Sequence, residues 1–411
     1  MRSAPLKNRS LQRLCGAQFT SLTATYAIYF ASMALVEELT HSSTQMGLMI
    51  LSSTLPGFLF GLMAGVVADR REKVEILIAS NALRILVALL FLAAVRFLPP
   101  TYLLLAVYLS NFCLSALIQF VISAESALIP AFVTNDKLMA ANSLFNLSSL
   151  ASQGAGFILL APLMLKLGGY QAVGLAGAIA YLIAVILLFP LPRERVAQAP
   201  KRGRTLGELL AELREGWRFI ISDRLVLAAT FQLTLILTVG LMLATLAPGF
   251  LARVLGLELA DAVYMATPAG LGFGLGMVLV GRYGRLLSKE RWIHLGFISL
   301  SAALFVLPFL KEAKGISLLL LLLVAFGLGL GFALIIIPAK TILQERPPEQ
   351  MRGRVISTQL ALGNAASTVP MPLSGGLADL IGIRKVILLI ALIALGTGVV
   401  SIRHAHSSSS P

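Results

Sequence analysis

Residues 53–70 read STLPGFLFGLMAGVVADR, an apolar, glycine-rich run that ends in a carboxylate and a cation. Residues 265–282, MATPAGLGFGLGMVLVGR, repeat its pattern of proline, glycines and a terminal arginine. A second matching pair, ISAESALIP at 122–130 and IPAKTILQE at 337–345, is separated by a similar length of chain. Parallel repeats of long apolar segments are typical of transporters whose substrate site lies between two related halves.

Twelve stretches of the chain are long and apolar enough to cross a bilayer, which takes about 20 residues per helix. Helices are expected because hydrocarbon offers the backbone no hydrogen-bond partners. The composition agrees, since 57% of residues are hydrophobic and 13% are charged, against about 25% charged in soluble domains. The predicted spans are 15–36, 46–68, 75–97, 101–124, 139–165, 170–191, 225–251, 262–282, 292–310, 316–338, 355–381 and 384–402. We therefore predict an all-α membrane protein with two pseudo-symmetric bundles of six transmembrane helices.

A polar segment separates the two sets of six spans and defines the predicted domains. The N-terminal bundle is expected at 1–191, a cytoplasmic linker at 192–224, the C-terminal bundle at 225–403 and a disordered tail at 404–411. Within the linker, LGELLAELREGWRFI at 206–220 has apolar residues at helical spacing. We predict an amphipathic helix on the inner membrane face; a linker helix without lipid contact is the alternative.

The Lys and Arg residues indicate which way the chain crosses the membrane. If the N-terminus is cytoplasmic, 25 of the 33 fall on the cytoplasmic side, 7 fall on the other side, and Arg84 lies inside a span. Because cytoplasmic loops are enriched in these residues, we predict a multi-pass protein of the cell (inner) membrane with both termini cytoplasmic. The net charge of +14 does not indicate nucleic-acid binding, since the basic residues lie in short tracts between spans.

The chain lacks the sequence signatures of catalysis. It has no HExxH, GxSxG or clustered His and carboxylate set, and no GxxxxGK[ST] loop that would hold ATP phosphates. Cys15 and Cys113 lie in apolar runs without a CxxC or His partner, so we expect buried thiols. We predict no enzyme activity, no metal and no cofactor, and transport energy from an ion gradient or from the substrate's own gradient.

The segment GVVADRREK at 65–73 resembles the loop between the second and third helices of the major facilitator superfamily, G-x-x-x-D-R-x-G-R-[KR]. Gly65, Asp69 and Arg70 match, Lys73 is basic where a basic residue is expected, and Glu72 replaces the second glycine. That replacement and several further segments are similar to the branch that includes enterobactin and macrolide exporters. These segments are ESALIP (125–130), AN (141–142), LQER (343–346), RGRV (352–355) and, after Pro372, GGLAD (375–379). The resemblance implies the major facilitator fold, a central substrate site and transport by alternating access.

The same segment predicts a gate at the cytoplasmic ends of the helices. Gly61 and Gly65, four residues apart, permit close helix approach, and Asp69 can accept hydrogen bonds from the exposed N–H groups of a facing helix start. The resemblance places that start in the eleventh span. The predicted gating residues are Gly61, Gly65, Asp69, Arg70, Lys73, Glu125, Lys340, Arg352 and Arg354. The alternative is that Asp69 and its basic neighbours form a solvated turn.

Two charged residues within the N-terminal spans need partners. Arg84 lies about ten residues into the third span, where a cation costs at least ~2.5 kcal/mol, so it should face protein or water. It is predicted to pair with Glu125 or with an anionic substrate group, or else to be a structural arginine. Glu125 is predicted to be a charge-paired gate residue or, as the alternative, a carrier of the coupling proton.

Polar stripes mark the first, fourth and seventh spans, which together with the tenth line the cavity in the family that this chain resembles. The predicted cavity residues are Gln18, Ser21, Thr25, Tyr108, Asn111, Ser115, Gln119, Ser123, Thr234 and Thr238. The alternative is that these side chains join helices through hydrogen bonds. Neutral hydrogen-bonding groups in an apolar wall suit a lipophilic or amphipathic substrate better than a sugar or a phosphate.

We therefore predict a monomeric secondary transporter that exports a small amphipathic molecule, drug-like or siderophore-like, across the lipid bilayer. The resemblance implies H+ antiport, but the fifth-span motif expected for it, G-x-x-x-G-P-x-x-G-G, is reduced to QGAGF at 153–157 and lacks the proline. The coupling ion is therefore left open. Two other functions also stay open: a lysophospholipid transporter, to which the segment around 343–346 is similar, and a non-transporting membrane receptor or scaffold.

Overall fold

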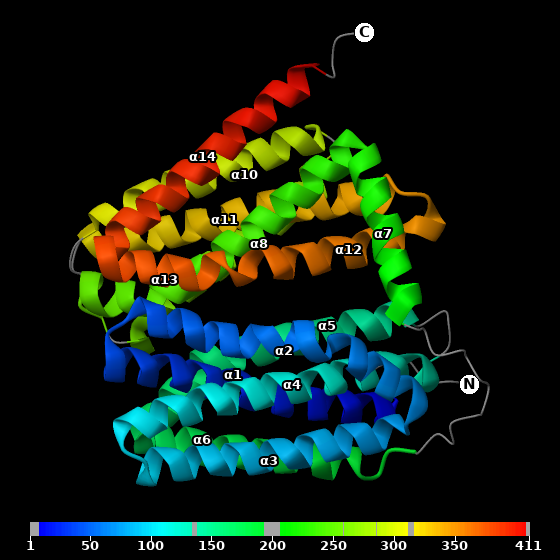
Figure 1. Cartoon of the computed structure of the whole chain (residues 1–411), viewed down its shortest axis with the longest axis vertical. Helices are drawn as coiled ribbons and strands as arrows, with labels where there is room; N and C mark the ends of the chain where they lie inside the picture. Colours follow the sequence, from blue (N-terminus) through cyan, green and yellow to red (C-terminus); the bar gives the residue numbers. More distant parts are fainter. Residues whose placement is uncertain are drawn as a thin grey trace. The chain divides into compact units, whose positions relative to one another are not determined.

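The computed structural model describes residues 8–133, 138–192, 206–257, 259–284, 286–310 and 316–407. These ranges are helical almost throughout and contain no β-strand (Figure 1). The helices before the linker are α1 Arg9–Thr40, α2 Ser43–Arg70, α3 Lys73–Phe97, α4 Pro100–Phe132, α5 Leu138–Gly154, η3 Ala155–Leu160 and α6 Ala161–Leu188. Those from the linker onward are α7 Leu206–Ser222, α8 Arg224–Phe250, η4 Leu251–Leu255, η5 Leu259–Ala262, α9 Val263–Tyr283, α10 Lys289–Val306, η6 Leu307–Phe309, α11 Ile316–Glu345, α12 Glu349–Thr368, α13 Pro370–Ile381 and α14 Ile383–Ser407. The prediction of an all-α protein is confirmed.

Eight helical segments within the described ranges are long and apolar enough to cross a membrane. Large apolar side chains cover the outsides of these and neighbouring helices, as at Phe97 (79% exposed) and Leu380 (83% exposed). A surface with so many large apolar side chains and so few charges is unfavourable in water, whereas the hydrocarbon of a lipid bilayer accepts it. The helices therefore have the surface of membrane spans.

One of these segments, Leu144–Leu188, passes through two predicted spans, 139–165 and 170–191. Its backbone leaves the helical conformation at Gly168 and Gly169, and the φ of Gly169 is 66°. Glycine adopts this φ freely because it has no Cβ. The helix is interrupted at this point, where the sequence predicts the boundary between the fifth and sixth spans.

The chain divides into two compact units. The first consists of Met1–Thr40 and Leu48–Arg204, and the second of His41–Gly47 and Thr205–Pro411. The short segment His41–Gly47, which includes the first turn of α2, is thus grouped with the C-terminal helices, while α2 continues from Leu48 in the first unit. The predicted N-terminal bundle, residues 1–191, contains the whole of α2.

Helix α1 forms the centre of the first unit, where it packs against α4, α5, η3 and α6. Its contact with η3 is close because a Cβ at Gly156 would lie only 2.6 Å from Tyr26 Cβ and 2.7 Å from the Thr23 carbonyl oxygen. Small residues allow this approach between membrane helices, where packing rather than water exclusion drives association. The Gly156 position of the fifth-span motif is therefore a packing position between α1 and η3.

Helix α11 has the corresponding central place in the second unit, between α9 and α10. A Cβ at Gly329 would overlap the Ala269 carbonyl of α9, and a Cβ at Gly331 would lie 2.9 Å from the Gly296 carbonyl oxygen of α10. The glycine repeat of the tenth span, GLGLG at 327–331, thus lets α11 approach two neighbours at once.

The end of the chain differs from the sequence-based expectation in one detail. Helix α14 extends to Ser407, so the first four residues of the segment 404–411, predicted to be a disordered tail, continue the helix. Residues 408–411 lie outside the described residues, as do residues 193–205 of the predicted linker.

Candidate functional site

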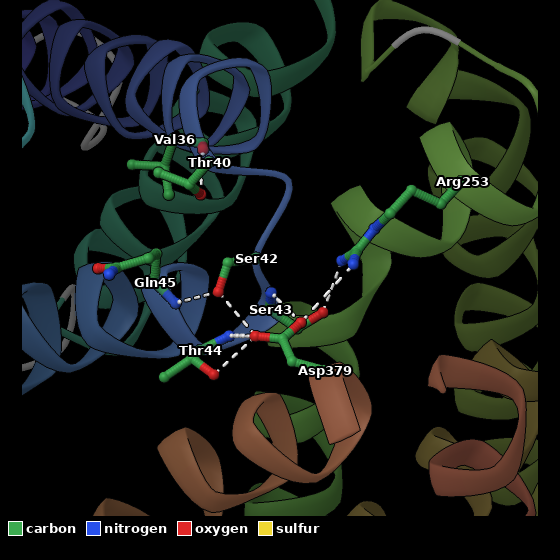
Figure 2. Close-up of polar contacts among 8 residues, drawn as sticks. All are labelled: Val36, Thr40, Ser42, Ser43, Thr44, Gln45, Arg253 and Asp379. Atoms are coloured by element: carbon green, nitrogen blue, oxygen red, sulfur yellow. Dashed lines mark hydrogen bonds and ion pairs between the residues drawn. The ribbon is translucent and has the colours of Figure 1, made fainter. Parts of the chain in front are cut away.

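A cluster of polar side chains joins the end of α13 to the beginning of α2 (Figure 2). Its centre is Asp379, near the C-terminus of α13. We define the Asp379 cluster as Ser42, Ser43, Thr44, Arg253 and Asp379. The carboxylate accepts hydrogen bonds from the backbone N–H groups of Ser43 (2.8 Å) and Thr44 (2.9 Å), and from the hydroxyls of Ser42 and Thr44 (both 2.7 Å).

The cluster satisfies the N–H groups at the start of α2, which have no partner within their own helix. Ser42 accepts a hydrogen bond from the Gln45 N–H through its Oγ (3.3 Å), so it acts as the N-cap residue. Asp379 accepts from the two N–H groups in between. Its negative charge also lies at the positive end of the α2 dipole. Asp379 therefore caps α2 from another helix.

Arg253, on η4, supplies the cation of the cluster. Its Nη2 donates to Ser43 Oγ (2.6 Å) and its Nη1 lies 3.6 Å from Asp379 Oδ1. About a third of each of these two charged side chains is exposed, 30% for Arg253 and 27% for Asp379. The pair is therefore partly hydrated, and it avoids the desolvation cost of a fully buried ion pair.

Two glycines bring the backbones of α2 and α13 into direct contact beneath the cluster. A Cβ at Gly375 would overlap the Ser43 carbonyl, and a Cβ at Gly47 would lie 2.9 Å from Pro372 Cα. No larger residue fits at either position without moving one helix. The Asp379 cluster is thus built on a close helix contact, and its hydrogen bonds depend on that contact being kept.

The segment GGLAD at 375–379 contributes to the family resemblance, but Asp379 and Arg253 are not among the residues predicted for the site. A signal was present, however. Asp69 ends the segment GVVAD at 65–69 and Asp379 ends GGLAD at 375–379, so Gly-x-x-Ala-Asp occurs in the last turns of both helices. The capping arrangement predicted for Asp69 is the one observed at Asp379. The side chain of Asp69 itself lies outside the described residues.

The other predicted gating residues lie apart from this cluster. Arg70 and Lys340 are exposed, and Lys73 begins α3. In its own unit a Cβ at Gly65 would meet no atom within 4 Å, and one at Gly61 would meet only Gln119 Oε1 at 4.0 Å. Gly61 and Gly65 therefore do not mediate a close helix contact inside the first unit.

The predicted gate arginines of α12 have partners in the second unit. Arg352 Nε donates to the Pro347 carbonyl oxygen (3.3 Å). Arg354 forms an ion pair with Glu215 of the linker helix α7. The Thr358 hydroxyl lies 3.3 Å from the Leu213 carbonyl oxygen, to which it donates a hydrogen bond. These contacts attach α7 to α12, across whose end it runs in Figure 1.

Arg84 lies at the centre of a polar cluster inside the first unit. Its guanidinium is fully buried, donates from Nη1 to Ser21 Oγ (2.6 Å), and lies 5.7 Å from the centre of the Tyr181 ring. Ser21 in turn donates to Asn81 Oδ1 (2.8 Å). Glu125, only 4% exposed, interacts electrostatically with Arg84. Arg84 Nε and Nη2 have no hydrogen-bond partner within the described part of the chain.

The polar stripe predicted on the first span faces the interior of the first unit. Gln18, Ser21 and Thr25 are all buried. Thr25 Oγ1 lies within hydrogen-bond distance (2.8 Å) of the Tyr181 hydroxyl on α6. These contacts correspond to the alternative that sequence analysis left open, hydrogen bonds that join helices.

The residues of the predicted polar stripe on α4 differ in how deeply they are buried. Asn111 is buried and donates to Ser32 Oγ (2.9 Å), and Ser115 donates to the Ser53 carbonyl of α2. Tyr108, Gln119 and Ser123 are half-buried. On α8, Thr238 is buried at hydrogen-bond distance (2.9 Å) from Ser367 Oγ of α12, whereas Thr234 is half-buried. The half-buried members therefore remain the better candidates for contact with a substrate.

Comparison with known proteins identifies the family of this chain. The sequence profile of the Major Facilitator Superfamily matches residues 14–370, which is most of the chain. The chain belongs to the major facilitator superfamily. It is a multi-pass membrane transporter and not an enzyme, and the major facilitator fold predicted from the sequence is confirmed.

Individual relatives agree with this family. The chain is 24% identical over 396 residues to the uncharacterized MFS-type transporter YfiS of Bacillus subtilis (strain 168), covering 96% of this chain and 93% of that protein. It is 27% identical over 265 residues to the multidrug efflux pump Tap of Mycolicibacterium fortuitum, covering 63% and 61%. Among solved structures, the nucleoside transporter NupG is similar in fold, with a TM-score of 0.73, 13% identity, and 96% and 98% of the two chains covered.

Proposed function

We propose that this major facilitator protein exports a small amphipathic or lipophilic molecule, drug-like or siderophore-like, by alternating access. The observation that carries the direction of transport is the 27% identity to a multidrug efflux pump over 265 residues. The proposed location is the cell (inner) membrane, with both termini cytoplasmic and the protein a monomer, as the Lys and Arg distribution favours for the termini.

The half-buried side chains support an amphipathic substrate. Gln119, Ser123 and Thr234 offer neutral hydrogen-bonding groups, and they lie on helices that are otherwise rich in leucine, isoleucine and phenylalanine. Apolar side chains of this kind would contact the apolar part of a substrate, and the few polar side chains would orient the substrate through hydrogen bonds. A sugar or a phosphate would need many more polar or cationic partners. The similarity to enterobactin and macrolide exporters, read from the sequence segments above, points to the same substrate class.

Proton antiport is the coupling mode that we propose for this export. Glu125 is a buried carboxylate within α4, and the fully buried Arg84 is its electrostatic neighbour. A carboxylate in such a place can gain and lose a proton as its contact with the cation changes. The other role predicted for Glu125, a charge-paired gate residue, is the alternative to this proton-carrying role.

Transport in proteoliposomes tests this proposal. Purified protein is reconstituted with an imposed pH gradient, and the uptake and efflux of a lipophilic cation, a macrolide and a lysolipid are compared. Movement of the cation or the macrolide against its gradient, driven by protons moving the other way, supports the proposal. Movement of the lysolipid alone would favour the lysophospholipid transporter to which the segment at 343–346 is similar, and no movement of any of the three compounds would overturn the proposed substrate class.

A further inference from the structure

The linker helix α7 has one buried face and one exposed face. Gly216 and Ile220, four residues apart, are buried within the second unit. A Cβ at Gly216 would overlap the Thr358 hydroxyl oxygen of α12, so this face of α7 lies directly on α12. Trp217 (42% exposed) and Ile221 (51% exposed) are large apolar side chains on the other face. The described residues of the second unit therefore leave an apolar surface of α7 uncovered.

Two arginines lie beside this apolar surface. Arg214 and Arg218 are exposed and four residues apart, so they follow one line along the helix. Trp217 comes three residues after Arg214, and Ile221 three residues after Arg218. Side chains at this spacing are neighbours on a helix surface. The exposed face of α7 is thus apolar along one edge and cationic along the other.

The positive charge of these two arginines is not matched within the described part of the chain, where neither has an acidic side chain at ion-pair distance. Glu215, also exposed, forms an ion pair with Arg354 of α12 instead. Asp223, just after α7, accepts hydrogen bonds from two N–H groups at the start of α8. Arg224 adds a further exposed cation. Both carboxylates therefore have other partners, and the arginine edge of α7 stays cationic.

We propose that the exposed face of α7 binds anionic phospholipids of the cytoplasmic leaflet. A helix with arginines beside tryptophan and an aliphatic residue is suited to the membrane interface, where its apolar edge enters the acyl boundary. In Figure 1, α7 runs across the end of α12 rather than alongside it, which is the direction of a helix that lies on a membrane surface. The proposal rests on the predicted orientation of the chain, and not on the substrate or direction of transport.

The charge of the lipid follows from the charge of the helix. Anionic lipids give the cytoplasmic leaflet a negative surface potential, and each Lys or Arg near such a surface gains about fivefold in binding. A zwitterionic lipid has no net charge that would attract the arginines. Because the contact at Gly216 attaches α7 to α12, lipid bound to α7 also holds this end of α12 at the inner leaflet.

Quenching of Trp217 fluorescence by brominated lipids tests this proposal. The full chain is placed in nanodiscs of equimolar phosphatidylcholine and phosphatidylglycerol, with bromine on the acyl chains of one lipid or of the other. The chain has two tryptophans, so the signal of Trp217 is the difference between the unmodified protein and Trp217→Phe. We expect both lipids to quench Trp217, with an association constant about fivefold or more higher for phosphatidylglycerol.

Variants of the two arginines test the origin of this preference. Arg214→Gln/Arg218→Gln should bring the ratio of the two association constants close to one, while quenching by lipid persists. Arg214→Lys/Arg218→Lys should keep the ratio, because the attraction depends on charge. Arg282→Gln/Arg291→Gln is the matched control, since it removes two exposed cations from α9 and α10, and it should leave the ratio unchanged.

Three results would overturn the proposal. The first is quenching of Trp217 by iodide in the water but not by brominated lipid, which would leave the exposed face of α7 to water or to a protein partner. The second is an equal association constant for the two lipids in the unmodified protein. The third is an equal loss of preference in the α7 variant and in the control. None of these measurements involves transport, so a failure of the proteoliposome assay does not affect them.

Discussion

Arg354 of α12 forms an ion pair with Glu215 of α7, so the linker helix is attached to the span that carries the predicted gate arginines. Each partner is more than a third exposed, and a pair of this kind contributes about 0.2–1 kcal/mol. The helix contact next to it is tighter, because Gly216 of α7 lies directly on the backbone of α12. The apolar side chain of Ile220 is fully buried in the same unit. Most of the attachment therefore comes from packing.

The first prediction concerns this packing. A Cβ at Gly216 would overlap Thr358 Oγ1 and lie 2.7 Å from the Arg354 carbonyl oxygen. We expect Gly216→Ala to lower the stability by about 1–3 kcal/mol, as overpacking does in a tight contact. Thermal unfolding in detergent measures this. Gly353→Ala on α12 is the control, since a Cβ there meets no atom within 4 Å; equal midpoints for the two variants would contradict the close contact.

The second prediction concerns the buried cation. Arg84→Met should lower the stability by about 1–3 kcal/mol, because it removes the buried hydrogen bond from Arg84 Nη1 to Ser21 Oγ and takes away the cation that is the electrostatic neighbour of Glu125. Adding Glu125→Gln should recover part of the loss, because the amide carries no charge. Thermal midpoints of the two single variants and the double variant measure the coupling. Strictly additive changes would show that Arg84 and Glu125 do not act as a pair.

The third prediction separates two glycines of the fifth-span motif. Gly156→Ala should destabilise the protein by about 1–3 kcal/mol, because the new Cβ would be pressed against Tyr26 and Thr23 of α1. Gly154→Ala, two residues earlier, should be neutral or slightly stabilising, since a Cβ there has open space and alanine favours helix by about 1 kcal/mol. The two purified variants are compared by their monodispersity and by the midpoint of their thermal unfolding. A reversed order would mean that η3 does not pack on α1 as described.

The fourth prediction concerns Asp69 and transport. Asp69→Asn should reduce the transport rate about tenfold or more, because the sequence predicts that Asp69 accepts charge-assisted hydrogen bonds from a helix start, and it should leave membrane insertion intact. Flux is compared at equal amounts of reconstituted protein, with Glu75→Gln, a nearby carboxylate in the first turn of α3, as the control. Unchanged flux in Asp69→Asn would leave Asp69 as part of a solvated turn.

The polar stripe of the first span illustrates a limit of sequence periodicity. Gln18, Ser21 and Thr25 recur at helical spacing, which places them on one face of α1. Periodicity does not say which neighbour that face meets. The structure turns Ser21 and Thr25 toward Asn81, Arg84 and Tyr181, a choice that depends on how α1 is rotated among α3, α4 and α6.

The sequence by itself determined the helical membrane architecture, the interruption between the fifth and sixth spans, and the superfamily. The lengths of the apolar runs and the motif at 65–73 are local features of the sequence, and local physics fixes their outcome. Only the tertiary structure revealed that Asp379 caps α2, that Arg354 pairs with Glu215, and that Arg84 donates to Ser21 beside the ring of Tyr181. The partners in each of these contacts are far apart in the chain. The local sequence around a charged residue does not show which distant group will lie next to it in the folded protein.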